Sequence, residues 1–222
     1  MGINLGEVVP NFKADTTDGP LEWHSYIEGC WAILFSHPAD FTPVCTTELG
    51  TVAALQPEFE SRGVKLAALS CDDVESHKEW IKDIVAAPFA KGSTMKFPII
   101  ADPSRELAVK WGMVDPDEKD ANGLPMTCRA VFIIGPDKKL KLSLLYPATT
   151  GRNFDEVLRV VDSLQLTASA SVATPASWIR GAKCMVVPSL SDEEAVRKLG
   201  GFEVTEVPSG KKYIRMTEDP SA

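Results

Sequence analysis

The sequence predicts an α/β fold, because short apolar runs that fit buried strands alternate with segments of helical character. Residues 31–36 (WAILFS) and 64–70 (VKLAALS) are apolar runs of strand length. Residues 42–61, between them, are expected to form a helix, and residues 73–85 carry apolar side chains at helical spacing. Alternating strands and helices favour a sheet with parallel crossovers.

The elements further along the chain predict a mixed sheet. Residues 97–101 are strand-like, and 130–134 and 140–146 are strand candidates joined by a Gly-Pro-Asp-Lys turn, which indicates an antiparallel pair. Residues 153–166 begin with an Asn that suits a helix cap and continue with helical periodicity. The main domain is therefore expected to span residues 1–166.

Residues 167–222 are expected to form a small C-terminal α+β extension. The stretch 167–175 (TASASVATP) is small and polar, which predicts a linker. Two short strands and a helix at 191–199 are expected after it.

The composition is that of a folded protein without an obvious polyanionic partner. Of the 222 residues, 44% are hydrophobic and 24% are charged, which is usual for globular domains. The net charge is −8 and the basic pairs are isolated, which argues against nucleic acid or an anionic membrane as partner. No apolar run approaches the roughly 18 residues that span a bilayer.

The cysteines indicate a reducing compartment. There are five of them, Cys30, Cys45, Cys71, Cys128 and Cys184, and they include no CxxC pair. Small secreted proteins instead carry even sets of cysteines that form a disulfide framework. Free thiols and a cytoplasmic location are therefore expected.

The stretch HPADFTPVCTTELG places Cys45 where a helix would support a negative charge on its sulfur. Thr42 suits the N-cap and Pro43 the first helical position, so Cys45 is expected at about the third position. The unpaired N–H groups and the positive dipole end of the helix favour a thiolate there. The sequence predicts a reactive nucleophile, and the alternative is a small buried structural cysteine.

The other cysteines lack this setting. Cys30 lies beside the first predicted strand, Cys71 follows the second, and Cys184 is in the tail, so structural roles are expected for them. Cys128 precedes Arg129, a cation that could activate it, but it also leads into an apolar strand.

Pro38, Thr42 and Cys45 in PADFTPVC match the Pro-x-x-x-Thr-x-x-Cys motif of peroxiredoxins. Residues 115–167 resemble the one-cysteine, peroxiredoxin-6-like branch in particular, and the resemblance extends over essentially the whole chain. It implies a thioredoxin-like fold, with a central mixed sheet flanked by helices. It also implies a thiol peroxidase that reduces hydrogen peroxide and organic hydroperoxides, including phospholipid hydroperoxides.

The resemblance implies roles for the residues around the sulfur. Cys45 is the expected peroxidatic nucleophile and becomes a sulfenic acid. Thr42 offers a hydroxyl to the attacked and departing oxygens, and Arg129 stabilises the thiolate and the leaving oxygen. The alternatives are that Thr42 is only a helix cap and that Arg129 only pairs with a carboxylate such as Glu48, which would orient it.

Three further residues belong to the expected site. Pro38 would shield the sulfur from water, and His37 would help to position substrate or reductant, unless it is a structural histidine. Arg152 matches a second arginine near the family's site. No cofactor is expected, because the chemistry needs only sulfur. His24, His37 and His77 show no ligand-like spacing, so no metal site is predicted.

The resolving cysteine of two-cysteine peroxiredoxins has no counterpart at the matching position. Where a Val-Cys-Pro segment is expected, this chain has Thr174 before Pro175. An external thiol such as glutathione, or another small reductant, is therefore expected to reduce the sulfenic acid. Nothing in the sequence selects Cys71, Cys128 or Cys184 as an internal substitute. A homodimer, or a higher oligomer, is expected from the resemblance, with the C-terminal extension at the dimer contact.

Two other functions stay open. Some members of this branch are credited with phospholipase A2 activity, and this chain has His24 and Asp137 at the matching positions, but Cys30 replaces the serine. Without a sharp Gly-x-Ser-x-Gly turn, a structural role for Cys30 is favoured. The other alternative is a redox-controlled chaperone or signalling protein, in which oxidation of Cys45 changes assembly.

Overall fold

A computed structural model describes residues 2–221 and divides the chain into two compact units. The first unit ends at Phe154 and the second begins at Asp155. The expected boundary lay after residue 166, which would place the last long helix in the first domain. The limits 1–166 and 167–222 therefore stay a prediction, and each unit is described by itself.

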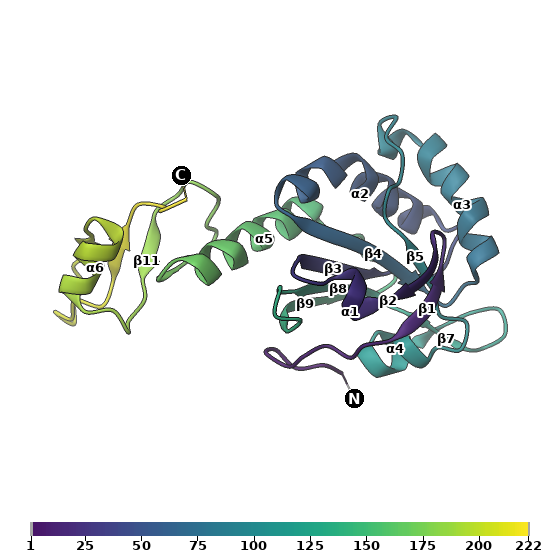
Figure 1. Cartoon of the computed structure of the whole chain (residues 1–222), viewed down its shortest axis with the longest axis horizontal. Coiled ribbons are helices and arrows are strands. Elements are labelled where there is room, and N and C mark those ends of the chain that lie inside the picture. Colours follow the sequence, from purple (N-terminus) through teal and green to yellow (C-terminus); the bar gives the residue numbers. More distant parts are fainter. Residues whose placement is uncertain (1, 222) are drawn as a thin grey trace. The chain divides into compact units, whose positions relative to one another are not determined.

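The first unit alternates strands and helices as expected (Figure 1). Its strands are β1 (Lys13–Thr16), β2 (Gly19–Glu22), β3 (Trp31–Ser36), β4 (Val64–Ser70), β5 (Ile99–Ala101), β6 (Val114–Lys119), β7 (Pro125–Thr127), β8 (Arg129–Ile134) and β9 (Leu140–Tyr146). Its helices are α1 (Trp23–Tyr26), α2 (Pro43–Ser61), α3 (Val74–Ala86), the short 3₁₀ helix η1 (Pro88–Ala90) and α4 (Glu106–Trp111).

Seven strands form a mixed sheet in the order β2-β1-β5-β4-β3-β8-β9. The pairs β3–β4 and β4–β5 are parallel, and β8 pairs antiparallel with both β3 and β9. Helices α2 and α3 lie on one face of the sheet, and α1 and α4 lie on the other (Figure 1). The predicted crossovers and the predicted β8–β9 pair are both present.

Strand β3 is apolar because both of its faces are covered. Ala32 and Leu34 pack in one cluster with Trp23 and Trp111, whereas the ring of Phe35 meets Phe59 of α2 at a centroid distance of 6.5 Å. The strand therefore has a fixed register, and the loop that follows it delivers α2 to a fixed place at the end of the sheet.

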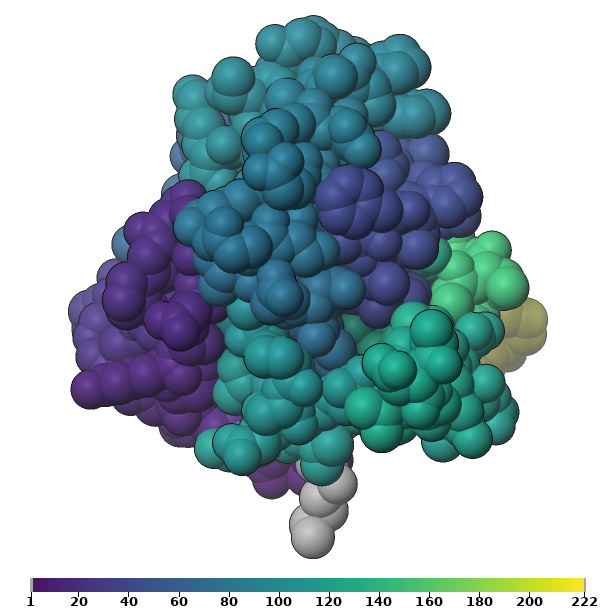
Figure 2. All heavy atoms as spheres, turned by 90° about the vertical axis from the view of Figure 1, so that its right-hand side faces the viewer, coloured from purple at the N-terminus to yellow at the C-terminus, as the bar shows by residue number. Residues whose placement is uncertain are grey.

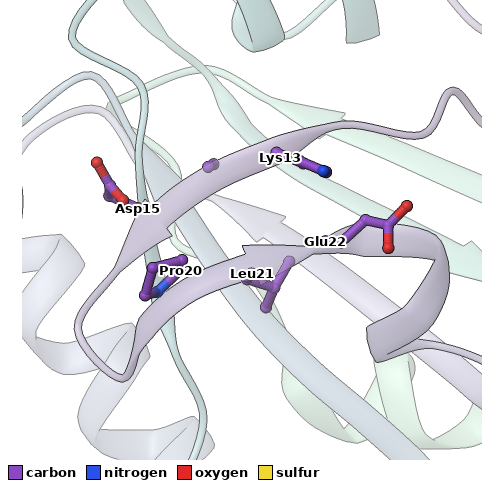
Figure 3. Close-up of a pocket in the computed structure, with 6 residues that line it drawn as sticks. Lys13, Asp15, Pro20, Leu21 and Glu22 are labelled. Atoms are coloured by element: carbon purple, nitrogen blue, oxygen red, sulfur yellow. The ribbon is translucent and has the colours of Figure 1, made fainter.

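The N-terminal strands lie at one edge of this sheet. In Figure 2 they appear in purple, beside the blue and teal segments that follow β4. β1 and β2 form an antiparallel hairpin, on which Lys13 faces Glu22 across the strands. Figure 3 shows the residues that line a pocket on this hairpin, and they are remote in sequence from the HPADFTPVC stretch.

The second unit contains a small sheet and two helices. Helix α5 spans Phe154–Ser169 and α6 spans Asp192–Leu199, and four short strands pair in the order β10 (Val172–Ala173), β11 (Cys184–Val186), β13 (Arg215–Thr217) and β12 (Glu203–Val204). The predicted linker at 167–175 is wrong, because α5 continues to Ser169 and β10 follows at once. Small residues are compatible with helix when packing supports it.

The sheet of the second unit has four strands where two were expected. Helix α6 begins as predicted at Ser191, whose hydroxyl accepts from the backbone N–H of Glu194 in a capping box. No helix within residues 2–221 is both long enough and apolar enough to cross a membrane.

Candidate active site

Cys45 lies in the first turn of α2, as predicted, and its side chain is fully buried. Pro43 is the first residue of the helix and Thr42 occupies the N-cap position with an extended backbone. The helix therefore directs its unpaired N–H groups and its positive dipole end toward the sulfur.

The hydroxyl of Thr42 does not cap the helix, which corrects the expectation from sequence. Its Oγ1 donates to the carbonyl of Ala39 at 2.9 Å and makes no bond to the first turn of α2. Because the hydroxyl proton is committed to Ala39, the lone pairs of Oγ1 remain to accept a hydrogen bond. Thr42, three residues before Cys45, therefore keeps capacity to accept a hydrogen bond at Oγ1 but not to donate one.

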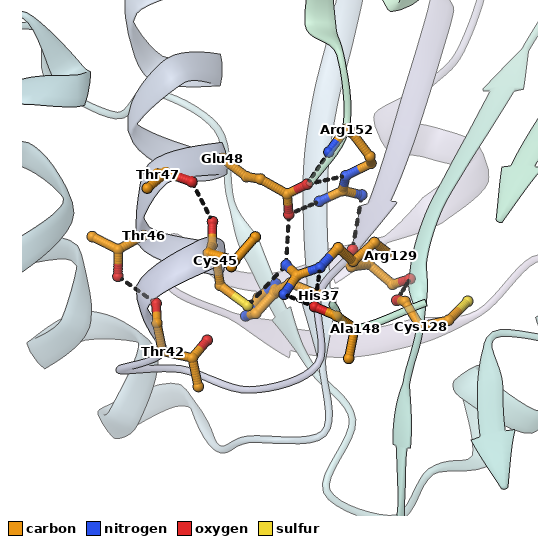
Figure 4. Close-up of polar contacts among 12 residues, drawn as sticks. His37, Thr42, Cys45, Thr46, Thr47, Glu48, Cys128, Arg129, Ala148 and Arg152 are labelled. Carbon is orange, nitrogen blue, oxygen red and sulfur yellow. Dashed lines mark hydrogen bonds and ion pairs between the residues drawn. The ribbon is translucent and has the colours of Figure 1, made fainter. Parts of the chain in front are cut away.

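Arg129, the first residue of β8, brings a positive charge to the sulfur (Figure 4). Its Nη1 lies 3.2 Å from Sγ of Cys45 and 2.8 Å from Oε2 of Glu48. Its Nε and Nη2 donate to the carbonyl of Ala148 at 2.9 and 2.5 Å. One edge of the guanidinium is thus anchored to the backbone while the other faces the thiol.

Glu48 joins the two arginines of the site. Its Oε1 accepts from Nε of Arg152 at 3.0 Å, and its Oε2 accepts from Nη2 of Arg152 at 2.8 Å. Burial opposes ionisation of Glu48, but the charge and hydrogen bonds of Arg152 and the charge of Arg129 outweigh it and hold the pKa of the carboxyl below its ordinary value.

Arg152 supports the site from behind. Its Nη1 donates to the carbonyls of Ser36 and Ala130 at 2.9 and 2.6 Å, and its guanidinium lies over the ring of Phe35. Its guanidinium contacts Glu48 rather than the sulfur, so the structure places it as a partner of Glu48. The second role weighed for Arg129, pairing with Glu48, occurs together with its contact to Cys45.

Pro38 and His37 lie in the loop between β3 and α2, and both are buried. Nε2 of His37 lies 3.0 Å from Oδ1 of Asp40, and Nδ1 of His77 lies 2.7 Å from Oδ2 of the same carboxylate. The fold therefore brings together two histidines that lack ligand-like spacing in the sequence. Each of these three residues could offer one metal-ligand atom, although the spacing of the histidines in the sequence did not predict such a group.

Burial disfavours the thiolate in three of the other cysteines. Burial raises the pKa of Cys71 to about 11, and burial also raises the pKa of Cys128 and of Cys184. Cys30 lies in the bend before β3, not within the strand. All five cysteines are free of disulfides.

The residues weighed for a hydrolase have other partners. Nε2 of His24 lies 2.8 Å from the carbonyl of Val9, and Asp137 accepts from Lys141 at 2.6 Å and from the backbone of Lys139 at 3.2 Å. Neither contact supports a charge relay to Cys30.

A buried thiol at a helix N-terminus, touched by a guanidinium, is typical of enzymes that use a cysteine nucleophile, and comparison with known proteins identifies the family. The AhpC/TSA family model matches residues 5–143, and the model for the C-terminal domain of 1-Cys peroxiredoxin matches residues 163–201. The chain belongs to the peroxiredoxin family, in its one-cysteine branch. It is accordingly a thiol-dependent peroxidase, as the resemblance predicted.

Full-length relatives agree. Peroxiredoxin-6 of Gallus gallus is 60% identical and that of Rattus norvegicus 59% identical, each over 99% of both chains. Among solved structures, the C45S mutant of the peroxiredoxin 6 of Arenicola marina is 62% identical, with a TM-score of 0.96 over 100% of both chains. A yeast mitochondrial 1-Cys peroxiredoxin is 44% identical, with a TM-score of 0.86 over 97% of this chain and 99% of that one. The predicted thioredoxin-like fold is thus confirmed.

Sequence reasoning did not find all of the site. The pairing of Glu48 with Arg152, the anchoring carbonyl of Ala148 and the cluster around Asp40 all depend on contacts between distant segments. Glu48 lies three residues after Cys45, so the two side chains share one face of the predicted helix. This spacing is the local sequence feature that predicts Glu48 near the sulfur.

Proposed function

We propose that Cys45 is the peroxidatic nucleophile of this peroxidase. Its thiolate attacks the terminal oxygen of a hydroperoxide, so that an S–O bond forms and the O–O bond breaks. The sulfur is oxidised to a sulfenic acid, and the departing oxygen takes up a proton to leave as water or an alcohol. The observation that carries the proposal is the buried Nη1 of Arg129, shared between Sγ of Cys45 and Glu48.

The neighbouring groups fit the charges of this reaction. Arg129 stabilises the thiolate before the attack and the negative oxygen after it, without reorganisation, because Ala148 and Glu48 already hold it. Oγ1 of Thr42 accepts the O–H of the bound hydroperoxide and so aligns the O–O bond with the sulfur. Pro38 shields the sulfur from water, and Arg152 acts by holding Glu48.

An external thiol completes the cycle in this proposal. Raised pKa values keep Cys71, Cys128 and Cys184 protonated near neutral pH, which makes them slow to attack a sulfenic acid. The yeast relative is described as resolved through glutathione/thioredoxin systems, which supports a small or protein thiol as the reductant here. We also propose that the substrates include organic and phospholipid hydroperoxides. The protein forms a homodimer in this proposal and works in a reducing compartment such as the cytoplasm.

Stopped-flow oxidation of the reduced protein by hydrogen peroxide tests the assignment, with wild type beside Cys45→Ser. We expect a fast phase in wild type alone and an intact mass that increases by a single oxygen. A fast phase that persists in Cys45→Ser would reject Cys45 as the nucleophile and would direct attention to Cys128.

A further inference from the structure

The cluster of His37, Asp40 and His77 lies beside the Cys45 site, and the roles proposed above do not explain it. Both histidines are fully buried, and the side chain of Asp40 is 1% exposed. The ligand-type atoms of the three residues lie within 4.8 Å of one another. Burying three titratable groups together is costly unless their protons and charges are matched.

Hydrogen bonds to Asp40 determine where the protons lie. Its carboxylate accepts from Nε2 of His37 at 3.0 Å, from Nδ1 of His77 at 2.7 Å and from Oγ of Ser76 at 2.7 Å. Burial opposes its ionisation, but the hydrogen bonds of the two rings outweigh it and hold the pKa of Asp40 well below its ordinary value. An ionised carboxylate only accepts, so the two ring nitrogens that face it both carry protons.

The second nitrogen of His37 is then an acceptor. Nδ1 of His37 is buried and has no hydrogen-bond partner, so a proton at that atom would be an unsatisfied donor. Burial lowers the pKa of His37, which agrees with a neutral ring. The hydrogen bond at one nitrogen of an imidazole thus fixes the state of the other.

A metal ion fits this cluster less well than hydrogen bonds do. Coordination through Nε2 of His37 and Nδ1 of His77 would move both protons to the opposite ring nitrogens. Those atoms, Nδ1 of His37 and Nε2 of His77, are buried without an acceptor. Each ring would then bury an unpaired N–H, whereas the present arrangement buries only lone pairs.

The ring of His37 is close to the turn that carries Cys45. The centroid of the ring lies 5.0 Å from the ring centroid of Trp80. Nε1 of Trp80 donates at 3.1 Å to Oγ1 of Thr46, the residue that follows Cys45. His37 also lies in the loop that leads into the first turn of α2, and Figure 4 shows it in the same close-up as Cys45. Its backbone is held by N–H donation to Leu69 and by the hydroxyl of Thr127.

We propose that Asp40 is a positioning residue of the peroxidase site. By accepting a hydrogen bond from the N–H at Nε2, it leaves Nδ1 of His37 unprotonated, as a fixed hydrogen-bond acceptor for the Cys45 site. A neutral acceptor suits a site in which hydrogen peroxide brings a second O–H donor beside the one that Thr42 accepts, and in which the sulfenic acid product brings an O–H donor of its own. The inference rests on the proposed role of Cys45.

Asp40→Asn is the sharp test, because it keeps the shape of the side chain. An amide offers one acceptor and one donor, so it cannot accept from both rings. We expect the ¹⁵N spectrum of the imidazoles to show an unprotonated Nδ1 on His37 in wild type and a changed tautomer in the variant. We also expect oxidation of Cys45 by hydrogen peroxide to slow by about tenfold to a hundredfold.

Ser76→Ala is the matched control, because it removes the third bond to Asp40 and leaves both rings in place. It should keep wild-type nitrogen spectra and oxidation rates. A protonated Nδ1 on His37 in wild type would overturn the inference, even if Asp40→Asn fails to fold. So would a wild-type oxidation rate in Asp40→Asn while Cys45→Ser is inactive, and that result would leave the proposed function intact.

Discussion

The buried charges around Cys45 leave a net positive charge beside its sulfur. Glu48 contributes one negative charge, and Arg129 and Arg152 contribute two positive charges, all from buried side chains. An unbalanced buried charge is costly. Nη1 of Arg129 lies 3.2 Å from Sγ of Cys45, so the excess positive charge faces the sulfur. Glu48 therefore orients Arg129 while leaving one positive charge for the sulfur.

Glu48→Gln tests this balance through the stability of the fold. The variant leaves Arg129 and Arg152 buried without their carboxylate, and we expect it to lose about 3–5 kcal/mol of unfolding free energy at pH 7. The folded state lowers the pKa of Glu48, so its stabilisation is complete above the unfolded value of about 4.3. That stabilisation is lost as the pH falls through the lower folded value.

Urea unfolding between about pH 3 and pH 7 measures the difference between wild type and Glu48→Gln. We expect a wide difference above about pH 5 that narrows in acid. Glu58→Gln is the control, because Glu58 is exposed on the same helix and pairs with Arg62 at the surface. A difference for Glu48→Gln that stays constant with pH would contradict the charge argument.

At the scale of elements, the first turn of α2 is arranged for a ligand rather than for capping. A threonine at an N-cap usually accepts from a backbone N–H of the first turn. Here the hydroxyl of Thr42 donates to Ala39 instead, and Oγ1 of Thr46 donates to the carbonyl of Thr42. The turn thus keeps backbone donors near Cys45 that an ordinary cap would satisfy.

Thr42→Val and Thr42→Ser separate chemistry from helix stability. Valine keeps the shape but removes the acceptor, so we expect oxidation of Cys45 to fall by about a hundredfold. The loss in unfolding free energy should be only about 1 kcal/mol, the net value of one hydrogen bond. Serine keeps the hydroxyl and should retain most of the rate in the same stopped-flow assay. Equal rates for valine and serine would reduce Thr42 to a structural residue.

The elements that the sequence predicted correctly are those with strong local patterns. β3, β4, α2, α3 and the β8–β9 pair each carry apolar periodicity or clear turn residues. The β1–β2 hairpin was missed because its strands are short and polar and one includes Pro20. Helix α4 was missed because it is short and because Arg105, the residue at its N-cap, is not a type that usually caps helices. Arg105 has a left-handed backbone, with a φ of 63°, and its side chain makes no cap hydrogen bond.

The site was predictable only in part from local sequence. Cys45 stood out from its own flanking residues, but Arg129 lies 84 positions away and was found through the family motif. Asp40 and His77 are 37 positions apart in the sequence. Asp40 lies in the loop before α2, and His77 lies on α3. No periodicity reports such a contact, because the parallel crossover β3–α2–β4 is what creates it.

At the scale of the whole molecule, the setting of Cys45 differs from that of the other four cysteines. Cys45 is the cysteine that a guanidinium contacts. Cys128 and Cys184 are buried, and Cys30 and Cys71 are half-buried. A thiol whose pKa is raised holds little thiolate at neutral pH, so it competes poorly with a soluble thiol for a sulfenic acid.

Intact mass spectrometry of the oxidised protein tests whether the whole chain works with a single sulfur. After one equivalent of peroxide without added thiol, we expect a single added oxygen, and after glutathione a mixed disulfide that peptide mapping places on Cys45. Cys30→Ser and Cys71→Ser remove the two half-buried thiols and should give the same products. An internal disulfide in wild type, seen as the loss of two hydrogens, would contradict the one-cysteine cycle. If that loss vanished in one of the two variants, the missing thiol would be the resolving one.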